Sequence, residues 1–581
     1  MIPGKAIASF FFEVVQQDDG NDSTKSWQCK KCGDQKLSQK GYTNLRCHAA
    51  ACVGKTYEKD LQDHLDKVGC FVDNKGNIQP KEKNKPKTLV QQAINSFVTT
   101  NNNELRAYTW IRWLACRNMP LTEIENDLTR DLAKSYKPFS IKTIRKYILA
   151  TSSLVVDVIA AELKRARVLT LLLDGWTADG ASTHYIAIFA GYQHPDTQEY
   201  TEVLLAMQPT LDEEGAMDAD AHEELLDSTL ELYKLTKSNV LCLIGDNCNT
   251  NKCLAKQWDI PLVGCASHRF NLAVKHWMEK QPGLLTVIKK LSVLMSKACN
   301  LRSAHTLRHL TLHAFGKELR AQQMNETRWT SIFTMVERYL RIKTQLEAIP
   351  TLAPFCLVPT EAQMLKDAQV HLEIFKLVTV EIQAKGMDLA HCRKQFDTLL
   401  ECKDYADMSK YLAEDAKIID FQKFESGVRK IMAGEALDPQ EAIACAKLKE
   451  PAQARNGEDS DDDSSDDGIQ EMSVADKLKK NSNKRRKICT ETNKNQLTKG
   501  YIDVGNIICA TSNCCERLFS EAKYIMLPHR RSMSPILFEA LLYLKKNMRF
   551  WTIATVAKAM RVKEEDLEQE MEMDDDTFYE D

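Results

Sequence analysis

Three acidic residues have the types and positions that a divalent-metal site requires. Asp174 and Asp246 each follow a run of six mainly apolar residues, so each carboxylate is expected at the end of a buried strand. Glu516 enters a predicted helix in Cys515-Glu-Arg-Leu-Phe-Ser520. Carboxylates brought together repel unless a cation or shared proton compensates them, and two Mg²⁺ or Mn²⁺ ions about 3.5–4 Å apart could activate a nucleophile there. Taken singly, an Asp after a strand is more often a turn former or helix cap.

A second group of residues has the spacing of zinc ligands. Cys29 and Cys32 flank two lysines, and His48 and Cys52 are one helical turn apart. Together they can close a tetrahedral shell around Zn²⁺, which would supply much of the folding free energy of so small a segment. Cys47 is an alternative ligand, and a finger that contacts protein or has degenerated is the alternative interpretation.

Asp174 and Asp246 are expected to be positioned by the strands of one sheet. Apolar runs predict five strands, near residues 168–174, 184–192, 199–207, 239–245 and 260–264. A helix is predicted near residues 217–236, between the third and fourth strands. The carboxyl edge of an open α/β sheet is where ligands bind, which favours a site at Asp174 and Asp246. A long amphipathic stretch, residues 275–500, separates Asp246 from Glu516 and predicts a helical insertion.

Charge is strongly segregated near the end of this insertion. Residues 452–497 contain an acidic run followed by the basic clusters Lys477–Lys480 and Lys484–Lys487. This composition predicts a solvated, disordered loop, and the basic clusters resemble a bipartite nuclear import signal or a DNA-contacting segment. A plain charged linker is the alternative. A second acidic stretch, residues 554–581, is predicted to be a solvated tail.

Five motifs, in chain order, carry a resemblance to a known family. They are Asp174-Gly-Trp-Thr177, Gly245-Asp-Asn-Cys-Asn-Thr-Asn251, Gly264-Cys-Ala-Ser-His-Arg-Phe-Asn-Leu272, Thr327-Arg-Trp329 and Cys515-Glu-Arg-Leu-Phe-Ser520. Together they resemble the hAT superfamily of DDE DNA transposases and their domesticated relatives, from about Gln91 to Trp551. Cys515 departs from the pattern, because many relatives have Ser before Glu-Arg.

The resemblance implies a fold class: an α/β RNase H-like catalytic core with a large all-α insertion, an N-terminal small zinc finger and an all-α region. The implied domains are a BED-type zinc finger at 8–70, a linker at 71–90, an all-α DNA-binding region at 91–165, the first part of the core at 166–274, the helical insertion at 275–500, the end of the core with the hAT C-terminal dimerisation region at 501–553, and the tail.

The resemblance also implies residues that handle DNA. His268 matches the family's Cys-x-x-His motif beside the active centre. Arg328 and Trp329 match an Arg-Trp pair whose Trp stacks on a base that is flipped out as the DNA end is cut, and an indole face can accept an unstacked base. A buried structural Trp beside a solvated Arg is the competing interpretation, and the residues alone favour it.

The expected function is therefore DNA transposition, in which DNA is cut and joined at transposon ends by two-metal phosphoryl transfer. Asp174, Asp246 and Glu516 are the expected catalytic residues. The alternative is a domesticated, catalytically silent, DNA-binding and dimerising nuclear regulator. Expected partners are double-stranded DNA and a second copy of the chain, in a homodimer or larger assembly.

Composition agrees with a large intracellular protein. The chain has 581 residues, of which 43% are hydrophobic, enough for several cores. Its 19 cysteines are scattered, which favours reduced thiols, and the expected location is the nucleus. No apolar run is long enough to cross a bilayer, so no membrane partner is expected, and the short run Ala6–Phe12 is not typical of a signal peptide. The net charge of −3 neither favours nor excludes DNA binding.

Overall fold

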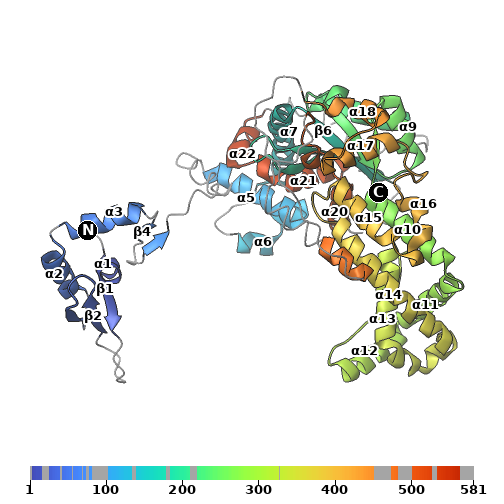
Figure 1. Cartoon of the computed structure of the whole chain (residues 1–581), viewed down its shortest axis with the longest axis horizontal. Coiled ribbons are helices and arrows are strands. Elements are labelled where there is room, and N and C mark those ends of the chain that lie inside the picture. The colour runs from blue at the N-terminus through green and yellow to red at the C-terminus, as the bar shows by residue number, and fades with distance from the viewer. Residues whose placement is uncertain are drawn as a thin grey trace. The chain divides into compact units, whose positions relative to one another are not determined.

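The computed structural model describes most of the chain, and the structural statements below concern the described residues. These are residues 3–15, 25–38, 42–54, 56–67, 70–72, 78–80, 102–133, 139–177, 183–209, 219–325, 328–450, 473–481, 500–526 and 533–562. The predicted linker from residue 81, most of the charged loop and the tail from residue 563 lie outside them. The chain forms two compact units, Met1–Thr99 and Thr100–Asp581 (Figure 1).

The first unit combines a small antiparallel sheet with three helices. The sheet has the order β1-β2-β3, formed by β1 (Phe12–Val15), β2 (Lys25–Cys29) and β3 (Gln35–Ser38). The other elements are α1 (Gly4–Phe11), α2 (Thr43–Cys52), α3 (Tyr57–Lys67) and a hairpin of β4 (Cys70–Val72) and β5 (Ile78–Pro80). Its core is small, built around Ile7, Phe12, Leu45, Leu61 and Leu65.

The second unit is organised around a mixed five-stranded sheet with the order β10-β9-β6-β7-β8. Its strands are β6 (Leu169–Thr177), β7 (His184–Gln193), β8 (Tyr200–Pro209), β9 (Val240–Gly245) and β10 (Leu262–Gly264). β6, β7 and β8 form an antiparallel meander, whereas β9 runs parallel to β6 and β10 parallel to β9. All five lie within a few residues of the predicted strands, which confirms those strand predictions.

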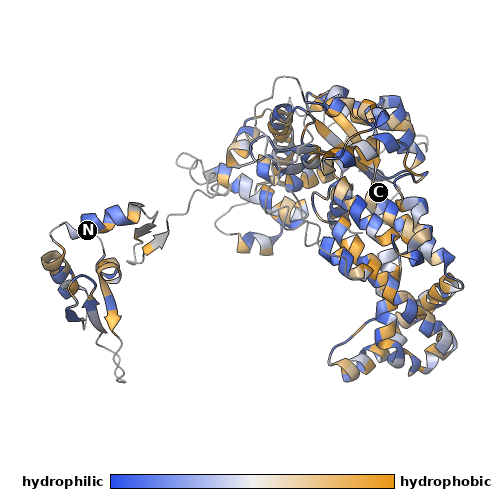
Figure 2. Ribbon diagram, viewed as in Figure 1, coloured by the Kyte–Doolittle hydropathy of each residue, from blue (hydrophilic) through white to orange (hydrophobic). Residues whose placement is uncertain are grey.

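The sheet is buried because helices cover it, and its strands are accordingly apolar (Figure 2). Every residue of β9 is buried. α20 (Asn513–Ile525) packs on β6 and β7, and α21 (Pro535–Lys546) packs on β8. α8 (Ala219–Leu232) and α9 (Asn249–Trp258) pack together, and the short η3 (Lys237–Asn239) leads into β9.

Helices from the beginning and the end of the second unit share one core. The early helices are α5 (Asn102–Arg117), η2 (Leu121–Ile124), α6 (Asp127–Leu132) and α7 (Ile141–Ala166). α5 and α7 both contact α21 and α22 (Ile553–Ala559), and η9 (Met548–Phe550) contacts α7. Residues 553–559 are thus helical although the predicted tail begins at 554, because Val556 and Ala559 are fully buried in this packing.

In the described residues, the stretch between β10 and α20 is mainly helical, as the amphipathic pattern of residues 275–500 predicts. Its elements are α10 (Ala266–Lys280), α11 (Leu284–Ala298), α12 (Leu301–Phe315), α13 (Trp329–Glu347), η4 (Pro350–Phe355), α14 (Pro359–Ile382), α15 (Leu389–Leu400), η5 (Lys403–Met408), α16 (Ser409–Leu412), α17 (Gln422–Ala433), α18 (Pro439–Ala444), η6 (Ala446–Leu448) and η7 (Val504–Asn506).

One part of the predicted disordered loop is ordered. Residues 474–481 are helical, Leu478 is 2% exposed, and Lys477 pairs with Glu401 at 2.7 Å. Leu478 and the partly buried Val474 pack on the core, and this burial offsets the polar composition that predicted disorder here. Within the described ranges, no helix combines the length and apolar character that a bilayer span needs.

Candidate metal centre and candidate active site

Cys29, Cys32, His48 and Cys52 come together in the first unit as a group that could hold a metal ion, and their ligand atoms all lie within 4.8 Å of one another. Cys29 Sγ is 4.0 Å from Cys52 Sγ, and Cys32 Sγ is 3.2 Å from His48 Nε2. In a tetrahedral site with bonds of about 2.3 Å from metal to sulfur, sulfur atoms lie about 3.8 Å apart. The donor set and spacing therefore fit Zn²⁺.

Local structure explains how the ligands meet. Cys29 ends β2, and the chain turns at Gly33, whose φ of +79° suits glycine and whose N–H donates to the Cys29 carbonyl at 2.9 Å. His48 and Cys52 lie on one face of α2 because residues four apart in a helix are neighbours. Cys47, one position before His48, is exposed and lies outside the group, so Cys52 is the fourth ligand in this geometry.

The pKa values of two thiols in the group are shifted in opposite directions. Burial alone would raise the pKa of Cys29, but the backbone N–H groups of Cys32 and Lys31 outweigh it and lower the pKa to about 7. The pKa of Cys52 is instead raised to about 11, first by its hydrogen bond with Cys32 and then by burial and Cys29. Crowded thiolates disfavour one another, and a bound metal ion would remove that penalty.

The three acids of the second unit are carried by three elements. Asp174 lies in β6, Asp246 directly follows β9, and Glu516 lies in the first turn of α20. Because β6 and β9 are parallel neighbours, their carboxyl ends meet at the same edge of the sheet. α20 packs on β6, which brings Glu516 to this edge from a distant part of the sequence.

The pKa of Asp174 reflects the proximity of the other two acids. The pKa of Asp174 is raised to about 7, first by burial and then by the negative charges of Glu516 and Asp246. The Gly175 N–H, which donates to Asp174 Oδ1 at 2.9 Å, and the Arg328 guanidinium oppose the rise. Carboxylates that destabilise one another in this way fit a site for a hard divalent cation.

Two of the three acids, Asp174 and Asp246, border open space. Among the described residues, the Cys–His group is the set of potential ligands whose atoms gather this closely, and the three acids do not form such a group. A cleft of about 300 Å³ is lined by both Asp174 and Asp246. An open site of this kind leaves room for a substrate beside the ions it would bind.

Two histidines that the sequence analysis did not single out also line this cleft. His184, in β7, lies opposite Thr177 and shares a 2.8 Å hydrogen bond with its hydroxyl through Nδ1, while His222 comes from α8. A Cβ atom at Gly175 would lie 2.5 Å from His184 Nε2, so the glycine makes room for the imidazole. Only the strand register and the packing of α8 bring these rings to the acids.

Hydrogen bonds fix Asp246 and connect its strand to α20. Asn251 Nδ2 donates to Asp246 Oδ1 at 2.6 Å. Cys265, which follows β10, donates through its N–H to the Gly245 carbonyl at 2.6 Å, and its thiol accepts from the Ser512 N–H at 3.4 Å. The thiol also accepts from the backbone N–H of His268, which lies in the first turn of α10 and has a partly exposed side chain. The buried Cys265 thus acts as a structural link.

Arg328 and Trp329 differ sharply in environment. The Arg328 side chain is 55% exposed and pairs with Glu516 at 3.4 Å. Trp329 is 2% exposed and packs among Phe270, Phe333 and Phe375. Stacking of a base on this indole, as the resemblance implies, would require Trp329 to leave that aromatic core; in this structure it anchors α13 and thereby positions Arg328.

No protein-family model matches the chain, and no curated protein matches it.

Proposed function

We propose that the chain is a metal-dependent DNA transposase of the kind that its motifs resemble, the hAT superfamily, which cuts and joins DNA by phosphoryl transfer. The observation that carries the proposal is the convergence of Asp174, Asp246 and Glu516 from distant parts of the sequence at one edge of the sheet. A purely structural role would give no reason for an acid cluster in which Glu516 and Asp246 help to raise the pKa of the buried Asp174.

The sheet topology supports an RNase H-like core. An antiparallel meander, β6 to β8, is followed by β9 and β10 parallel to β6, as expected from the resemblance. The helical content of the chain between Ala266 and Leu448 also supports the proposal, because the resemblance implies a large all-α insertion at 275–500.

In this proposal, Asp174, Asp246 and Glu516 would hold Mg²⁺ or Mn²⁺, which supply activation of the attacking oxygen and charge stabilisation of the leaving oxygen. The chain's other residues prepare the site. Asn251 orients the carboxylate of Asp246, the Gly175 N–H orients that of Asp174, and Arg328 partly neutralises Glu516. Because Arg328 is an exposed cation beside Glu516, it is also suited to contact a DNA phosphate.

The first unit would be a zinc-loaded, BED-type finger that contacts double-stranded DNA. Its support is the fit of the Cys–His group to Zn²⁺ and the exposed lysines 30 and 31 between the first two ligands. Nuclear location and a homodimer or larger assembly, mediated by the region around α21, complete the proposal.

The test is DNA cleavage by purified full-length protein with Mg²⁺ or Mn²⁺. The substrate is a supercoiled plasmid that carries the genomic sequences flanking the coding region, and the variants are Asp174→Asn, Glu516→Gln and, as a matched control in the same helix, Glu521→Gln. Glu521 pairs with Lys545 and Lys546, away from the acids. We expect nicking or cleavage by wild type and Glu521→Gln, and none by the other two. Plasmid binding without cleavage by wild type under either metal would instead favour the silent DNA-binding regulator.

A further inference from the structure

Helix α12, in the insertion, carries three of the chain's histidines at intervals of four residues: His305, His309 and His313. All three are exposed. Residues four apart lie one above the other on a helix, with Cβ atoms about 5–6 Å apart. The sequence therefore sets two overlapping pairs of imidazoles on one face of the helix, and His309 belongs to both.

The opposite face of α12 holds the helix in place. Ser303, Leu307 and Thr311, also spaced by four, are buried against the insertion, and the Thr311 hydroxyl accepts from the Leu319 N–H at 2.9 Å. α12 packs on α11 and α13. The histidines are consequently displayed on a fixed scaffold, and their exposure means that core packing does not account for them.

The rings of His305 and His309 already have a suitable separation. Their centroids lie 4.7 Å apart with an interplanar angle of 61°. Two imidazoles bound to one ion at adjacent coordination positions, with metal–nitrogen bonds of about 2.0–2.1 Å, have centroids about 4.5 Å apart. Little movement is needed for both rings to bind the same ion.

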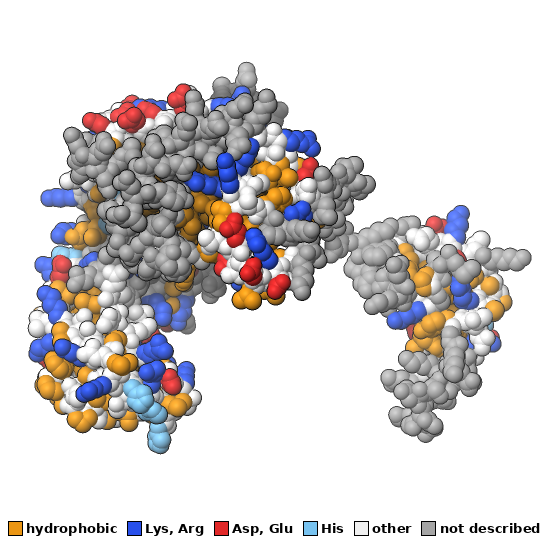
Figure 3. Space-filling view, turned by 180° about the vertical axis from the view of Figure 1, so that it is seen from behind, with side chains coloured by type: hydrophobic (Ala, Val, Ile, Leu, Met, Phe, Trp, Pro, Cys, Tyr) orange, Lys and Arg blue, Asp and Glu red, His pale blue; other side chains and the backbone are white. Residues whose placement is uncertain are grey.

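The charged residues around the α12 histidines indicate which metal ions these histidines could bind. α12 contains no Asp or Glu, and its other charged residues are the cations Arg302 and Arg308. The space-filling view has imidazoles among Lys and Arg side chains at the lower end of the helical insertion (Figure 3). A site of neutral nitrogen ligands in a cationic setting disfavours Mg²⁺, Mn²⁺ and Ca²⁺, which require oxygen ligands, and favours Zn²⁺, Ni²⁺ and Cu²⁺.

We propose that α12 carries a surface site for a borderline transition-metal ion, formed by the imidazole pair His305/His309 and the overlapping pair His309/His313. The site is separate from the Cys–His group and from the three acids. It leaves coordination positions of the ion open to water or to a ligand from another molecule.

The test is calorimetric titration of full-length protein with Ni²⁺ at pH 8. The protein is first loaded with Zn²⁺ and dialysed, which fills the Cys–His group, and millimolar Mg²⁺ in the buffer occupies sites that prefer oxygen ligands. The variants are His309→Gln, His305→Gln, His313→Gln and, as a matched control, His64→Gln, which changes an exposed histidine of the first unit. Circular dichroism verifies that every variant keeps the helical content of wild type.

We expect wild type and His64→Gln to bind Ni²⁺ and His309→Gln to lose that binding, because it breaks both pairs. His305→Gln and His313→Gln each leave one pair, so binding is expected to survive in at least one of them. Equal binding by His309→Gln and wild type, or no binding by wild type, would overturn the proposal. Loss in both single-pair variants would overturn it as well, since residues eight apart in a helix lie too far apart, about 12 Å, to share one ion.

Discussion

The carboxyl of Asp174 is held in an environment that a cation would relieve. Since cations that bind only the native state stabilise it, Mg²⁺ or Mn²⁺ is expected to raise the melting temperature of the wild-type protein, by the equivalent of about 2.7 kcal/mol at a hundredfold excess over Kd. Asp174→Asn removes a ligand and should abolish most of this shift. Differential scanning fluorimetry with zinc-loaded protein measures it, and Glu521→Gln should respond like wild type. An equal metal response in Asp174→Asn would refute a metal-binding role for this carboxylate.

A second acid, Glu539 in α21, should make stability depend on pH. Burial raises its pKa from 4.5 to about 7, although the Met207 N–H donates to its carboxyl at 2.9 Å. Between these pH values the native state keeps a proton that the unfolded state has released, so this group's contribution to native stability falls as pH rises through the window. At pH 8, Glu539→Gln should be more stable than wild type by at most about 3 kcal/mol, at about 1.4 kcal/mol per pKa unit.

Urea unfolding followed by fluorescence at pH 4.5, 6 and 8 measures this difference, which should vanish at the lowest pH. Glu521→Gln is a control that should change the free energy of unfolding at pH 8 in the opposite direction. Burial alone would raise the pKa of Glu521, but Lys546 and Lys545 lower it, so removing that charge should destabilise at pH 8. A Glu539→Gln effect that is the same at all three pH values would contradict the titration.

Between elements, one buried ion pair connects the sheet to the insertion. Arg269 of α10 lies 3.2 Å from Glu425 of α17, and Glu425 also accepts from the Gly264 N–H at the end of β10. Glu425→Gln would leave the 5% exposed Arg269 without a counter-charge, which typically costs about 3–5 kcal/mol. We expect a loss of that size in chemical unfolding.

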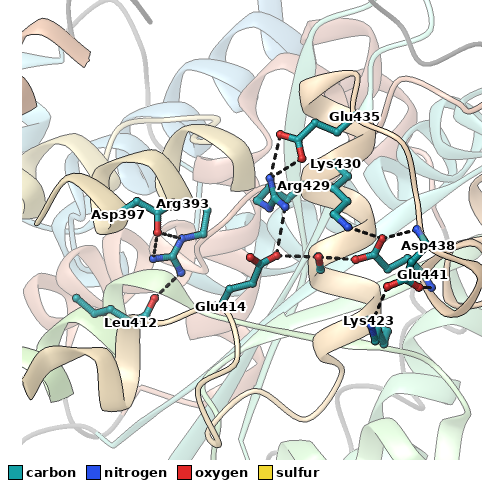
Figure 4. Close-up of polar contacts among 11 residues, drawn as sticks. Arg393, Asp397, Leu412, Glu414, Lys423, Arg429, Lys430, Glu435, Asp438 and Glu441 are labelled. Atoms are coloured by element: carbon teal, nitrogen blue, oxygen red, sulfur yellow. Dashed lines mark hydrogen bonds and ion pairs between the residues drawn. The ribbon is translucent and has the colours of Figure 1, made fainter. Parts of the chain in front are cut away.

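The matched control for this ion pair is Glu414→Gln. Glu414 pairs with Arg429 at 3.3 Å in the neighbouring polar network, where its side chain is 50% exposed (Figure 4). Exposed pairs contribute about 0–1 kcal/mol. Similar losses in Glu425→Gln and Glu414→Gln would mean that the buried pair has no special role in joining the two elements.

Local sequence patterns were sufficient for elements but not for the contacts between them. The strands follow from apolar runs, because β7 and β9 are buried along most of their length and β6 and β8 each have a buried run of five residues. The partnership of Arg269 with Glu425, the approach of His184 to Asp174 and the burial of Trp329 depend on residues far apart in the chain, for which one sequence carries no periodic signal. The helix at 474–481 was not predicted because Val474, Ala475 and Leu478 are its few apolar residues beside a highly charged stretch.

At the scale of the whole molecule, the two units differ in what is expected to stabilise them. The second unit has an extensive core that runs through the sheet and the insertion. The core of the first unit is far smaller, and Cys29 is itself a member of it. Small domains with little buried surface commonly depend on a metal for folding, so the units should respond differently when metal is withdrawn.

Removal of zinc is therefore expected to unfold Met1–Thr99 and leave Thr100–Asp581 folded, because zinc binding contributes on the order of 10 kcal/mol to such a unit. Hydrogen exchange measured peptide by peptide, with and without a zinc chelator, resolves the two units. Cys52→Ser should lose both zinc and the protection of α2, whereas Cys47→Ser, an exposed neighbour on the same helix, should keep both. Zinc retained by Cys52→Ser but lost from Cys47→Ser would reverse the ligand assignment. Simultaneous loss of protection in both units would instead show that the second unit depends on the first for its stability.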